Sequence, residues 1–437
     1  MTNCRQYEWT FPSCKSRKIH AAFDGGAVSS DGGVLLLRAA DRKVRLTEVL
    51  ERALSDPRRQ ASCDHRQKVM LRQRIYGLAL GYEDLNDHAT LREDVALQTA
   101  AETDQVLAST STLCRWENRA DRAAGWAIAT ILVEQFIRSH RRAPGELVLD
   151  FDATDDPVHG RQERRFFHGY YDQYCFLPLY VFCGEQLLVS YLRPSNIDGA
   201  RHAWAILALL VKRFRAVWPQ VRIVVRADSG FCRWRMLRWC ESHQVHYIVG
   251  LAKNPRLNAL ADTLQEQAER QFQQTGAKQR LFGDIEYAAA TWDRPRRVLA
   301  KAEHTEQGRN PRYVVTNLAG DPQRLYDAVY CARGEMENRI KEQQLDLFAG
   351  RTSCTRWWAN QFRLLLSSLA YVLIETIRRL GLTGTALARA QCGTIRLKLL
   401  KIGTVIRRNT RRVYFHFSSA YPYEKLFWRV ARRLSTG

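Results

Sequence analysis

The spacing of hydrophobic residues gives the first third of the chain a helical character. In residues 31–54 and 109–142, apolar side chains recur every three to four positions, which predicts amphipathic helices. Asp31 opens the first of these segments and is the expected N-cap. Pro144 and Gly145 then interrupt the pattern. We therefore expect residues 1–143 to form a helical N-terminal region.

After Glu146 the pattern changes to short apolar runs that predict strands. These runs cover residues 146–156, 174–183, 186–194, 221–230 and 246–252. Amphipathic helices are predicted between the later runs, at 199–218 and around 233–243. Three strands followed by a helix, a strand, a helix and a strand predict a mixed α/β layer, and we place its first part at 144–253.

A second change of pattern marks residues 254–320. A polar helix within 257–274 precedes three strand-like runs at 281–292, 296–304 and 312–319, which predicts a β-rich insertion in the α/β domain. The domain should resume over 321–383, with a helix at 326–348 and a long amphipathic helix at 355–380. Residues 384–437 remain as a separate C-terminal region.

The net charge of the chain indicates the kind of partner it binds. The 437 residues include 67 lysines and arginines against 45 acids, a net charge of +22, with a pI of about 9.8. Such an excess favours a polyanion, and nucleic acid is the usual one. Residues 384–437 hold twelve of the cations and a single acid, Glu424. The closely spaced Arg407, Arg408, Arg411 and Arg412 are candidate DNA-binding residues. The aromatic rings among them either stack on bases or, as we favour, pack a small core. The arginine-rich N-terminal region is a further candidate for DNA docking, although it has no clear helix-turn-helix signature.

Cysteine usage and hydropathy indicate the compartment. The 11 cysteines are scattered and form no C-x-x-C pair, which is typical of a reduced cytosolic protein. The segment "CDH" at 63–65 lacks a second ligand pair at zinc-like spacing, so we do not expect zinc. The N-terminus has no apolar core of a signal peptide, and the most apolar stretch, 364–374, is too short to span a bilayer.

Acids stand at the ends of two predicted strands. Asp150 and Asp152 point to the same face, because side chains alternate along a strand. Asp228 ends the fourth strand, just before the turn at Ser229 and Gly230. These acids either cap the turns or bind a metal ion. Metal binding gains weight if a third acid reaches the same place.

The helix predicted at 326–348 offers that third acid. At about 100° per residue, its buried stripe consists of Val329, Met336, Ile340 and Leu347. A second stripe on the shoulder of the buried face consists of Tyr330, Arg333, Glu337 and Lys341. Glu335 and Glu342 should face solvent, whereas Glu337 can reach a cleft. An ordinary i,i+4 salt bridge is the alternative reading of Glu337 with its flanking cations. Hydroxyl and cationic groups beside a carboxylate also suit a phosphate next to a metal ion.

Several separated motifs, taken in order, carry a family resemblance. The Y-x-x-R-x-x-x-E pattern of Tyr330, Arg333 and Glu337 occurs together with "LDFDATDDPVHG", "FFHGYYDQY", "RADSGF" and "LASTSTLCRWENR". This set resembles a DDE-type insertion-sequence transposase with an RNase H-like catalytic domain, and in particular the group known as the IS thirteen-eighty family. The likeness covers nearly the whole chain. The family's lysine usually lies where this sequence has Gln344, so Lys341 is a helical substitute for it.

The resemblance implies a fold, a site and a reaction. The fold would be an RNase H-like mixed sheet with a β-rich insertion, a helical N-terminal region and a basic C-terminal region. The catalytic and metal-binding triad would be Asp152, Asp228 and Glu337. Asp152 is preferred to Asp150 because the family's first acid is typically followed by a small residue and a threonine, here Ala153 and Thr154. Asp150 is the alternative candidate for an additional metal ligand. Tyr330, Arg333 and Lys341 would bind phosphate.

The same resemblance implies the cofactor and the partners. Two Mg²⁺ ions, for which Mn²⁺ should substitute, would serve cleavage at the transposon end and attack of the 3′-OH on target DNA. The partners would be double-stranded DNA, as terminal inverted repeats and as target, and a second copy of the chain in the synaptic complex. We expect a bacterial cytoplasmic protein associated with the nucleoid, without a membrane. The alternatives are a transposase-derived DNA-binding protein without catalysis and a metal-dependent nuclease without strand transfer.

Overall fold

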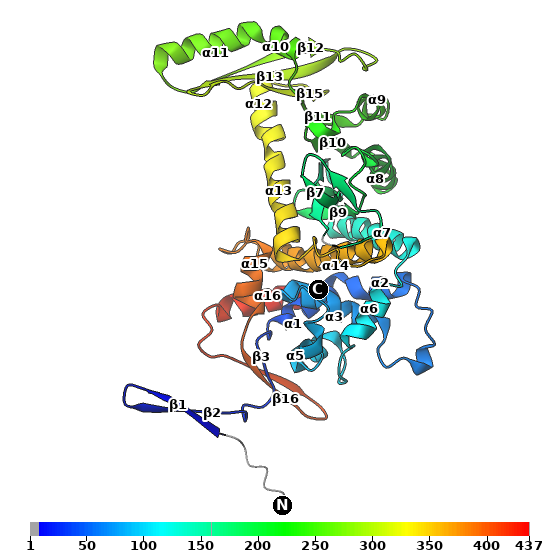
Figure 1. Ribbon diagram of the computed structural model, residues 1–437, viewed down its shortest axis with the longest axis vertical. Coiled ribbons are helices and arrows are strands. Elements are labelled where there is room, and N and C mark those ends of the chain that lie inside the picture. The colour runs from blue at the N-terminus through cyan, green and yellow to red at the C-terminus, as the bar shows by residue number, and fades with distance from the viewer. Residues whose placement is uncertain (1–7, 159, 437) are drawn as a thin grey trace, which may run out of the picture. The chain divides into compact units, whose positions relative to one another are not determined.

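The computed structural model describes residues 8–158 and 160–436, which divide into two compact units. The first unit combines Met1–Arg119 with Asp346–Phe348 and Leu369–Gly437. The second unit combines Ala120–Leu345 with Ala349–Ser368. Each unit is therefore assembled from segments that are far apart in the sequence (Figure 1).

A single large sheet organises the second unit. Its strands run in the order β12–β13–β15–β11–β10–β4–β8–β9, and the short β14 pairs with β13. The bounds of the five strands predicted for the α/β layer are β4 (Glu146–Ala153), β8 (Leu179–Cys183), β9 (Gln186–Tyr191), β10 (Arg222–Ala227) and β11 (His246–Leu251). β4, β10 and β11 are parallel, whereas β8 and β9 are antiparallel to their neighbours. This mixed arrangement is the predicted RNase H-like core.

The strand predicted at 174–183 is interrupted. Gln173–Phe176 forms β7, which belongs to a small separate sheet with β5 (Asp156–Pro157) and β6 (Phe166–His168). Only β8 continues into the large sheet. Pro178 lies between the two strands, and proline cannot donate a ladder hydrogen bond. A proline inside an apolar run was thus the signal for two strands.

Residues 254–320 extend the large sheet at its β11 edge. They form α10 (Pro255–Leu260), α11 (Asp262–Thr275), β12 (Gln279–Tyr287), β13 (Arg296–Thr305), β14 (Gly308–Arg309) and β15 (Arg312–Thr316). β15 pairs antiparallel with β11 and with β13, and β13 pairs with β12. The strands of this segment therefore continue the hydrogen bonding of the core (Figure 1).

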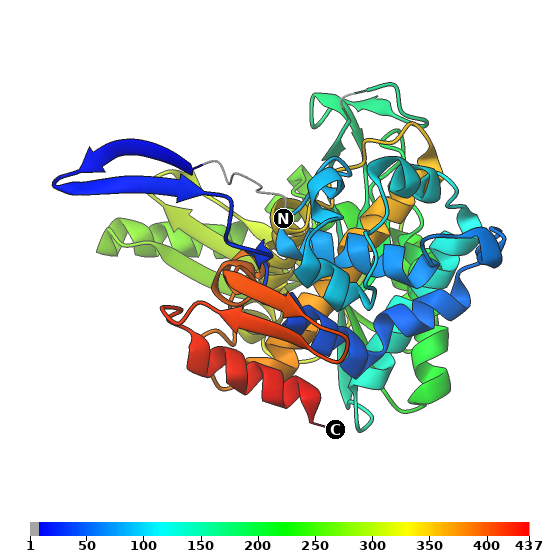
Figure 2. The ribbon, with the colours of Figure 1, turned by 90° about the horizontal axis from the view of Figure 1, so that it is seen from below.

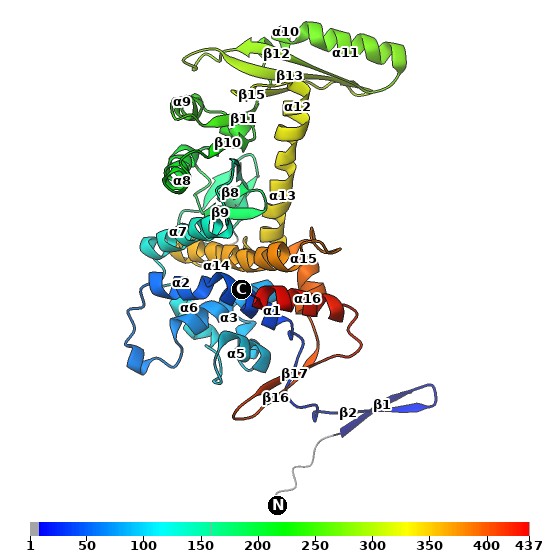
Figure 3. The same cartoon turned by 180° about the vertical axis from the view of Figure 1, so that it is seen from behind.

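Helices cover the two faces of the sheet differently. On one face, α7 (Arg122–Ser139), α8 (Ala203–Val217) and α9 (Trp234–Ser242) contribute side chains to the main hydrophobic cluster. On the other face, Leu325 and Tyr326 pack on Val224, Ile248 and Leu299 in a smaller cluster. The helical segment that starts with these two residues runs along the sheet opposite α8 and α9 (Figures 1 and 3). One face of the sheet thus stays available for a site beside this segment.

The first unit is mainly helical, and its helices are shorter than those expected from the sequence of residues 1–143. They include α1 (Val34–Val44), α2 (Leu46–Ala53), α3 (Gln67–Leu80), α4 (His88–Leu91), α5 (Val95–Ala101), α6 (Thr110–Glu117), α15 (Cys392–Ile395) and α16 (Glu424–Ser435). The helix expected over 31–54 is split because Arg45 adopts a left-handed conformation, φ 55°. The N-cap of α1 is Gly33, so the prediction of Asp31 was wrong. Asp31 is instead buried and accepts hydrogen bonds from the Tyr82 hydroxyl.

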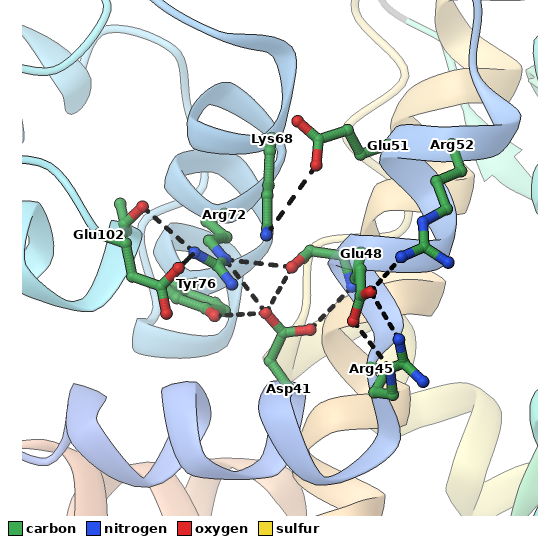
Figure 4. A network of polar contacts seen from close by, with 11 residues as sticks. Asp41, Arg45, Glu48, Glu51, Arg52, Lys68, Arg72, Tyr76 and Glu102 are labelled. Carbon is green, nitrogen blue, oxygen red and sulfur yellow. Dashed lines mark hydrogen bonds and ion pairs between the residues drawn. The ribbon is translucent and has the colours of Figure 1, made fainter.

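A buried polar network connects α1, α2 and α3 within the first unit (Figure 4). Asp41 accepts from the Tyr76 hydroxyl at 2.8 Å, from the Thr47 amide at 2.8 Å and from Arg72 at 3.2 Å. Arg72 also donates to Glu102 at 2.5 Å. Buried charges are tolerated only when they are paired and hydrogen-bonded, and this network meets that requirement for Asp41 and Arg72.

Two hairpins complete the first unit (Figure 2). β1 (Glu8–Cys14) and β2 (Arg17–Ala22) form an exposed hairpin that the sequence analysis did not predict. β16 (Thr404–Arg408) and β17 (Val413–Phe417) form the second hairpin, which pairs with β3 (Val28–Ser29). The basic C-terminal region is therefore anchored to the N-terminal part of the chain by a shared sheet.

The predicted long helix at 355–380 is present as α14 (Trp357–Thr376), with 20 residues. Its first part belongs to the second unit, and its residues from Leu369 onward belong to the first. In the described ranges 8–158 and 160–436, the helices are all too short or too polar to cross a membrane.

Candidate active site

The site begins at the ends of two neighbouring parallel strands. The register of β4 and β10 places Phe151 opposite Ala227, so that Asp152 and Asp228 follow at the same edge. Leu149 and Phe151 point into the main hydrophobic cluster, which leaves the alternate residues of β4 for the other face. The prediction that Asp150 and Asp152 share a face agrees with this pattern.

Asp150 and Asp152 nevertheless have different surroundings. Both Asp150 oxygens accept from the Arg226 guanidinium, at 2.5 and 2.7 Å, and Asp150 is only 2% exposed. The third contact of Arg226 is the backbone carbonyl of Val329, at 2.6 Å. This buried group, which we call the Arg226 clamp, joins β4, β10 and the helical segment opposite them. Asp150 thus takes part in a buried structural contact, and its assignment as an additional metal ligand stays a prediction.

The helical segment that carries Glu337 is irregular. It consists of α12 (Pro322–Arg324), a π-helical turn (Leu325–Tyr330), a 3-10 turn (Cys331–Arg333), α13 (Gly334–Lys341) and a second π-helical turn (Glu342–Asp346). Hydrogen bonding in π-helical turns spans five residues, so each turn shifts the register relative to an ideal helix. Turns of this kind occur frequently at functional sites.

Arg333 connects the helical segment to the strand ends. Its guanidinium donates to Glu337 at 2.7 Å and lies 3.6 Å from the nearer carboxylate oxygen of Asp152. Arg333 is the residue through which the predicted stripe meets the sheet. The i,i+4 salt bridge that the sequence left open is therefore present, but it includes a strand-end acid as a third member.

The three predicted acids share one electrostatic environment. Burial, together with the nearby carboxylates of Asp228 and Glu337, raises the pKa of Asp152 to about 7, although Arg333 acts in the opposite direction. Asp228 accepts from the amide of Gly230 at 2.8 Å and so caps the turn after β10. Asp228 and Glu337 thus lie within electrostatic reach of Asp152, although Glu337 follows Asp152 by 185 positions in sequence.

Tyr330 reaches the same edge from the helical side. A Cβ atom added at Gly250 of β11 would lie 2.6 Å from the Tyr330 hydroxyl oxygen and 2.9 Å from the amide nitrogen of Ser229. The absence of a side chain at Gly250 therefore makes room for this hydroxyl. Burial raises the pKa of Tyr330, and the carboxylate of Asp228 adds to this effect. Tyr330 accordingly belongs to the site.

The remaining predictions for this helical segment have mixed outcomes. Glu335 is exposed, as predicted, but Glu342 is only 2% exposed and pairs with Arg339 at 2.6 Å, so its assignment to solvent was wrong. The prediction from a helical periodicity of 100° per residue took only the side facing the sheet as buried. At this end the helical segment also contacts α14, where Gln343 donates to Ser368 at 3.2 Å. Lys341 is exposed, one turn beyond Glu337.

Gln344, at the position of the family's usual lysine, faces the loop after β4. Its side-chain amide donates to the backbone carbonyl of Asp155 at 3.1 Å. A neutral amide thus occupies this position near the first acid, and the nearest cation on the same segment is the exposed Lys341. The substitution of Lys341 for the family's lysine stays a prediction.

The donor set of the site fits a hard divalent cation, although its present arrangement does not enclose one. In residues 8–158 and 160–436, no three His, Cys, Asp or Glu side chains lie close enough together to hold one metal ion. Arg333 contacts both Asp152 and Glu337 and so compensates their charge. Carboxylate oxygens are the ligands that Mg²⁺ prefers, so the donor type at Asp152, Asp228 and Glu337 fits this cation, and their assignment as its ligands stays a prediction.

The four predicted DNA-binding arginines lie on the second hairpin of the first unit. Arg407, Arg408, Arg411 and Arg412 are all exposed. At the tip, residues 409–412 and Tyr414 line a shallow hollow. Arg408 pairs with Asp104 at 3.3 Å, which leaves the other three as the more accessible cations. Phe427 is buried and packs against Phe417, so part of the aromatic set forms a small core, as favoured from sequence.

Comparison with known proteins identifies the family. The family model described as transposase DDE domain group 1 matches residues 11–436. This chain belongs to that family of DDE transposases. The match spans both units, and the narrower resemblance to the IS thirteen-eighty family stays a prediction. Among proteins of curated function, none matches the sequence.

A solved structure of a transposase is also similar to this one. It is a piggyBac transposase synaptic complex with hairpin DNA, which aligns with a TM-score of 0.45 and 10% sequence identity. The alignment covers 84% of this transposase and 79% of the piggyBac chain.

The Arg226 clamp makes a prediction about stability. Arg226→Met should destabilise the transposase by about 3–5 kcal/mol, because it leaves the buried Asp150 carboxylate without its partner. The exposed Arg222–Glu146 pair joins the same two strands at 3.2 Å, so Arg222→Met is a matched control and should cost less than about 1 kcal/mol. Urea unfolding followed by circular dichroism measures both changes. Equal losses in the two variants would contradict the structural role of the clamp.

Proposed function

We propose that this transposase binds the ends of an insertion sequence, cuts them by two-metal phosphoryl transfer and joins the released 3′-OH ends to target DNA. The observation that carries the proposal is the contact of Arg333 with both Asp152 and Glu337, beside Asp228. One strand-end acid and one helix acid thereby contact a single cation, and the charge of the second strand-end acid also acts on it. The family match supports the reaction class.

Asp152, Asp228 and Glu337 are the proposed ligands of the two metal ions. When bound, Mg²⁺ or Mn²⁺ would supply an activated oxygen nucleophile and charge compensation for the leaving oxygen. The carboxylates hold negative charge at the strand edge, and the partial burial of Asp152 keeps bulk water away from it. Gly230 fixes the Asp228 carboxylate through its amide hydrogen bond, so this ligand is preorganised.

Arg333 and Tyr330 are the proposed phosphate ligands, with Lys341 as a third. Arg333 has donors beyond those it uses for Glu337, since a guanidinium carries five N–H groups. Release of its carboxylate partners would free the whole guanidinium for a DNA phosphate. The Tyr330 hydroxyl lies beside Asp228 and can donate to an oxygen on the same substrate. Lys341 is exposed on the same side of α13 as Glu337 and would contact the strand farther from the cut.

The DNA itself is the proposed partner of both units. The net charge of +22 and the exposed arginines of the β16–β17 hairpin support a long contact with a duplex. A second copy of the chain is the proposed protein partner, because a transposition reaction pairs two transposon ends.

Two alternative functions make different predictions. A DNA-binding protein without catalysis would not cleave DNA, and a nuclease without strand transfer would cleave it but form no joined product.

The triad makes the first prediction of this proposal. Asp152→Asn, Asp228→Asn and Glu337→Gln should each abolish Mg²⁺-dependent cleavage of transposon-end DNA while leaving DNA binding nearly unchanged. Each change removes one anionic metal ligand without altering side-chain size. Glu335→Gln, on the exposed side of the same helix, should remain active. Cleavage is measured on gels and binding by fluorescence anisotropy. If Asp150→Asn were folded and inactive while Asp152→Asn cut normally, the choice of first ligand would be wrong.

Arg333 allows a test of phosphate positioning against a simple salt bridge. Arg333→Ala should reduce cleavage by about 100-fold or more, as misplaced substrates commonly do. An i,i+4 pair alone would contribute only about 0.3–0.5 kcal/mol to stability and nothing to the reaction. Arg324→Ala, an exposed arginine at the start of the same helical segment, is the control. Single-turnover cleavage rates and melting temperatures should be measured for both, and equal rates would contradict the positioning role.

The hairpin arginines should determine part of the salt dependence. Replacing Arg407, Arg411 and Arg412 by Gln should flatten the log–log slope of duplex binding against salt by up to about 2.7, since each phosphate contact contributes about −0.9. Point changes are preferable to truncation, because β16 pairs with β3. Arg45→Gln with Arg52→Gln, both paired with Glu48, is the control and should leave the slope unchanged. An unaltered slope in the triple variant would mean that the hairpin does not contact phosphates.

A further inference from the structure

Aromatic residues gather on the small sheet that follows the first catalytic acid. β5 begins at Asp156, four residues after Asp152, and pairs with β7, which pairs in turn with β6. The segment "RQERRFFHGYYDQY", residues 161–174, supplies β6, the turn and the start of β7. It contains five aromatic rings of Phe and Tyr but no Leu, Ile, Val or Met. Part of this segment carried the family resemblance, yet neither the triad nor the phosphate ligands use it.

Most of these rings face solvent. The exposed fractions are 86% for Tyr170, 53% for Phe167, 48% for Tyr174 and 40% for Phe166. Large aromatic side chains dominate the energetics of cores and interfaces when they are buried, so four exposed rings on so short a segment indicate a binding surface. We call Phe167, Tyr170 and Tyr174 the ring surface.

The ring surface is ordered by its own contacts. Phe167 and Tyr174 are paired across β6 and β7, with ring centroids 5.7 Å apart in an edge-to-face arrangement. The guanidinium of Arg165 lies over the Tyr174 ring at 4.9 Å. Tyr170 meets Tyr171 edge-to-face at 5.0 Å. The rings are therefore held in defined positions and pay little ordering entropy when a ligand stacks on them.

The same segment adjoins the catalytic acids. Tyr171 lies within electrostatic reach of Asp155 and Asp152, whose charges add to the effect of burial in raising its pKa to about 12. Gln173 donates to the Asp155 carboxylate at 2.7 Å and ties the start of β7 to the loop after β4. Tyr170 is thus only one ring away from the surroundings of Asp152. A ligand on the ring surface would extend to the bond that these acids are proposed to cut.

Charge and composition select the kind of ligand. Arg161, Arg164 and Arg165 precede the rings in the segment, and Arg165 lies directly over the Tyr174 ring, whereas Arg164 lies over the Trp357 ring. Glu163, one of the two acids of the segment, accepts from the Trp357 amide at 2.8 Å. Rings beside cations are the features by which proteins bind single-stranded nucleic acid, since bases stack on the rings and phosphates pair with the cations. Paired bases in a duplex offer no free face for such stacking.

We propose that Phe167, Tyr170 and Tyr174 form a stacking surface for unpaired bases of the DNA strand whose phosphate lies at Asp152. This inference rests on the proposed function for the identity of the substrate. It adds that the DNA next to the cut is held locally unpaired. A second copy of the chain is the competing occupant of the same rings.

The test measures binding without catalysis. The full-length chain is titrated in EDTA against a fluorescein-labelled 15-nucleotide oligothymidylate and against a 15-base-pair duplex of random sequence. Tyr170→Ala with Tyr174→Ala should weaken binding of the single strand by about 10-fold or more and that of the duplex by less than about 2-fold. A 2-aminopurine base placed in the single strand should be quenched by the unaltered chain and not by the double variant.

Trp126→Ala is the control, because Trp126 is a 62% exposed ring on α7 of the same unit. It should change neither affinity nor quenching. Unchanged single-strand affinity in the double variant, or an equal loss for single strand and duplex, would overturn the proposal. A change in the sedimentation of the DNA-free chain without loss of single-strand binding would assign the rings to a contact between copies, and would also overturn it.

The outcome is independent of whether the transposase cuts DNA. If the unaltered chain fails to cleave with Mg²⁺ but the double variant loses single-strand binding, the proposed function fails and the stacking surface stands. If cleavage occurs and the double variant binds the single strand normally, only the stacking surface fails.

Discussion

The ion pair between Arg226 and Asp150 is the contact on which the geometry of the second unit depends. Its two charges lie at the centre of the large sheet, where removing them from water costs several kcal/mol for each ion. The cost is offset because the pairing is bidentate and because the third guanidinium nitrogen of Arg226 donates to the Val329 carbonyl. That carbonyl belongs to a π-helical turn. A buried polar group thus fixes the helical segment at one rotation and one height on the sheet.

The position of Glu337 follows from this constraint. Glu337 lies eight positions after Val329, and between them a 3-10 turn replaces part of the regular helix. A displacement of the backbone at Val329 would therefore also move Arg333 and Glu337. The strand acids are placed independently, by the parallel register of β4 and β10. Asp152 and Glu337 share a cation only because both placements agree, and Arg333 between them limits their mutual repulsion.

How far the sequence predicted this arrangement can be judged from individual elements. The order of strands and helices in the α/β layer and the common face of Asp150 and Asp152 follow from local periodicity. Such periodicity can be recognised in a single sequence. The separation of β7 from β8 was visible in Pro178. The burial of Glu342 was not predictable from helical periodicity, because this end of the segment has further neighbours: Glu342 pairs with Arg339, and the adjacent Gln343 contacts Ser368 of α14. The left-handed conformation of Arg45 was likewise not predicted, because arginine has no propensity for it.

The Arg226 clamp was also beyond sequence reasoning, although Arg226 stands two residues before Asp228. An arginine in an apolar strand pairs with an acid somewhere, but its partner could be named only after the register of β4 against β10 was known. The same register explains why Asp150 resembles a metal ligand in the sequence. It shares the face and the residue type of Asp152 and differs only in having a cation directly opposite, since Arg226 is its Cα partner.

The insertion takes part in building the site as well as extending the sheet. The hydrophobic cluster beneath the helical segment combines Val224 and Ile248 from the core strands with Leu299 and Val314 from the insertion strands. The Lys301 ammonium of β13 lies 5.5 Å from the centroid of the Tyr326 ring. Tyr326 precedes Tyr330 by one helical turn. The surface on which the Glu337 segment rests is therefore incomplete until β13 and β15 have joined β11. In the folded chain, the placement of the third acid therefore depends on the packing of the insertion strands as well as on the core strands.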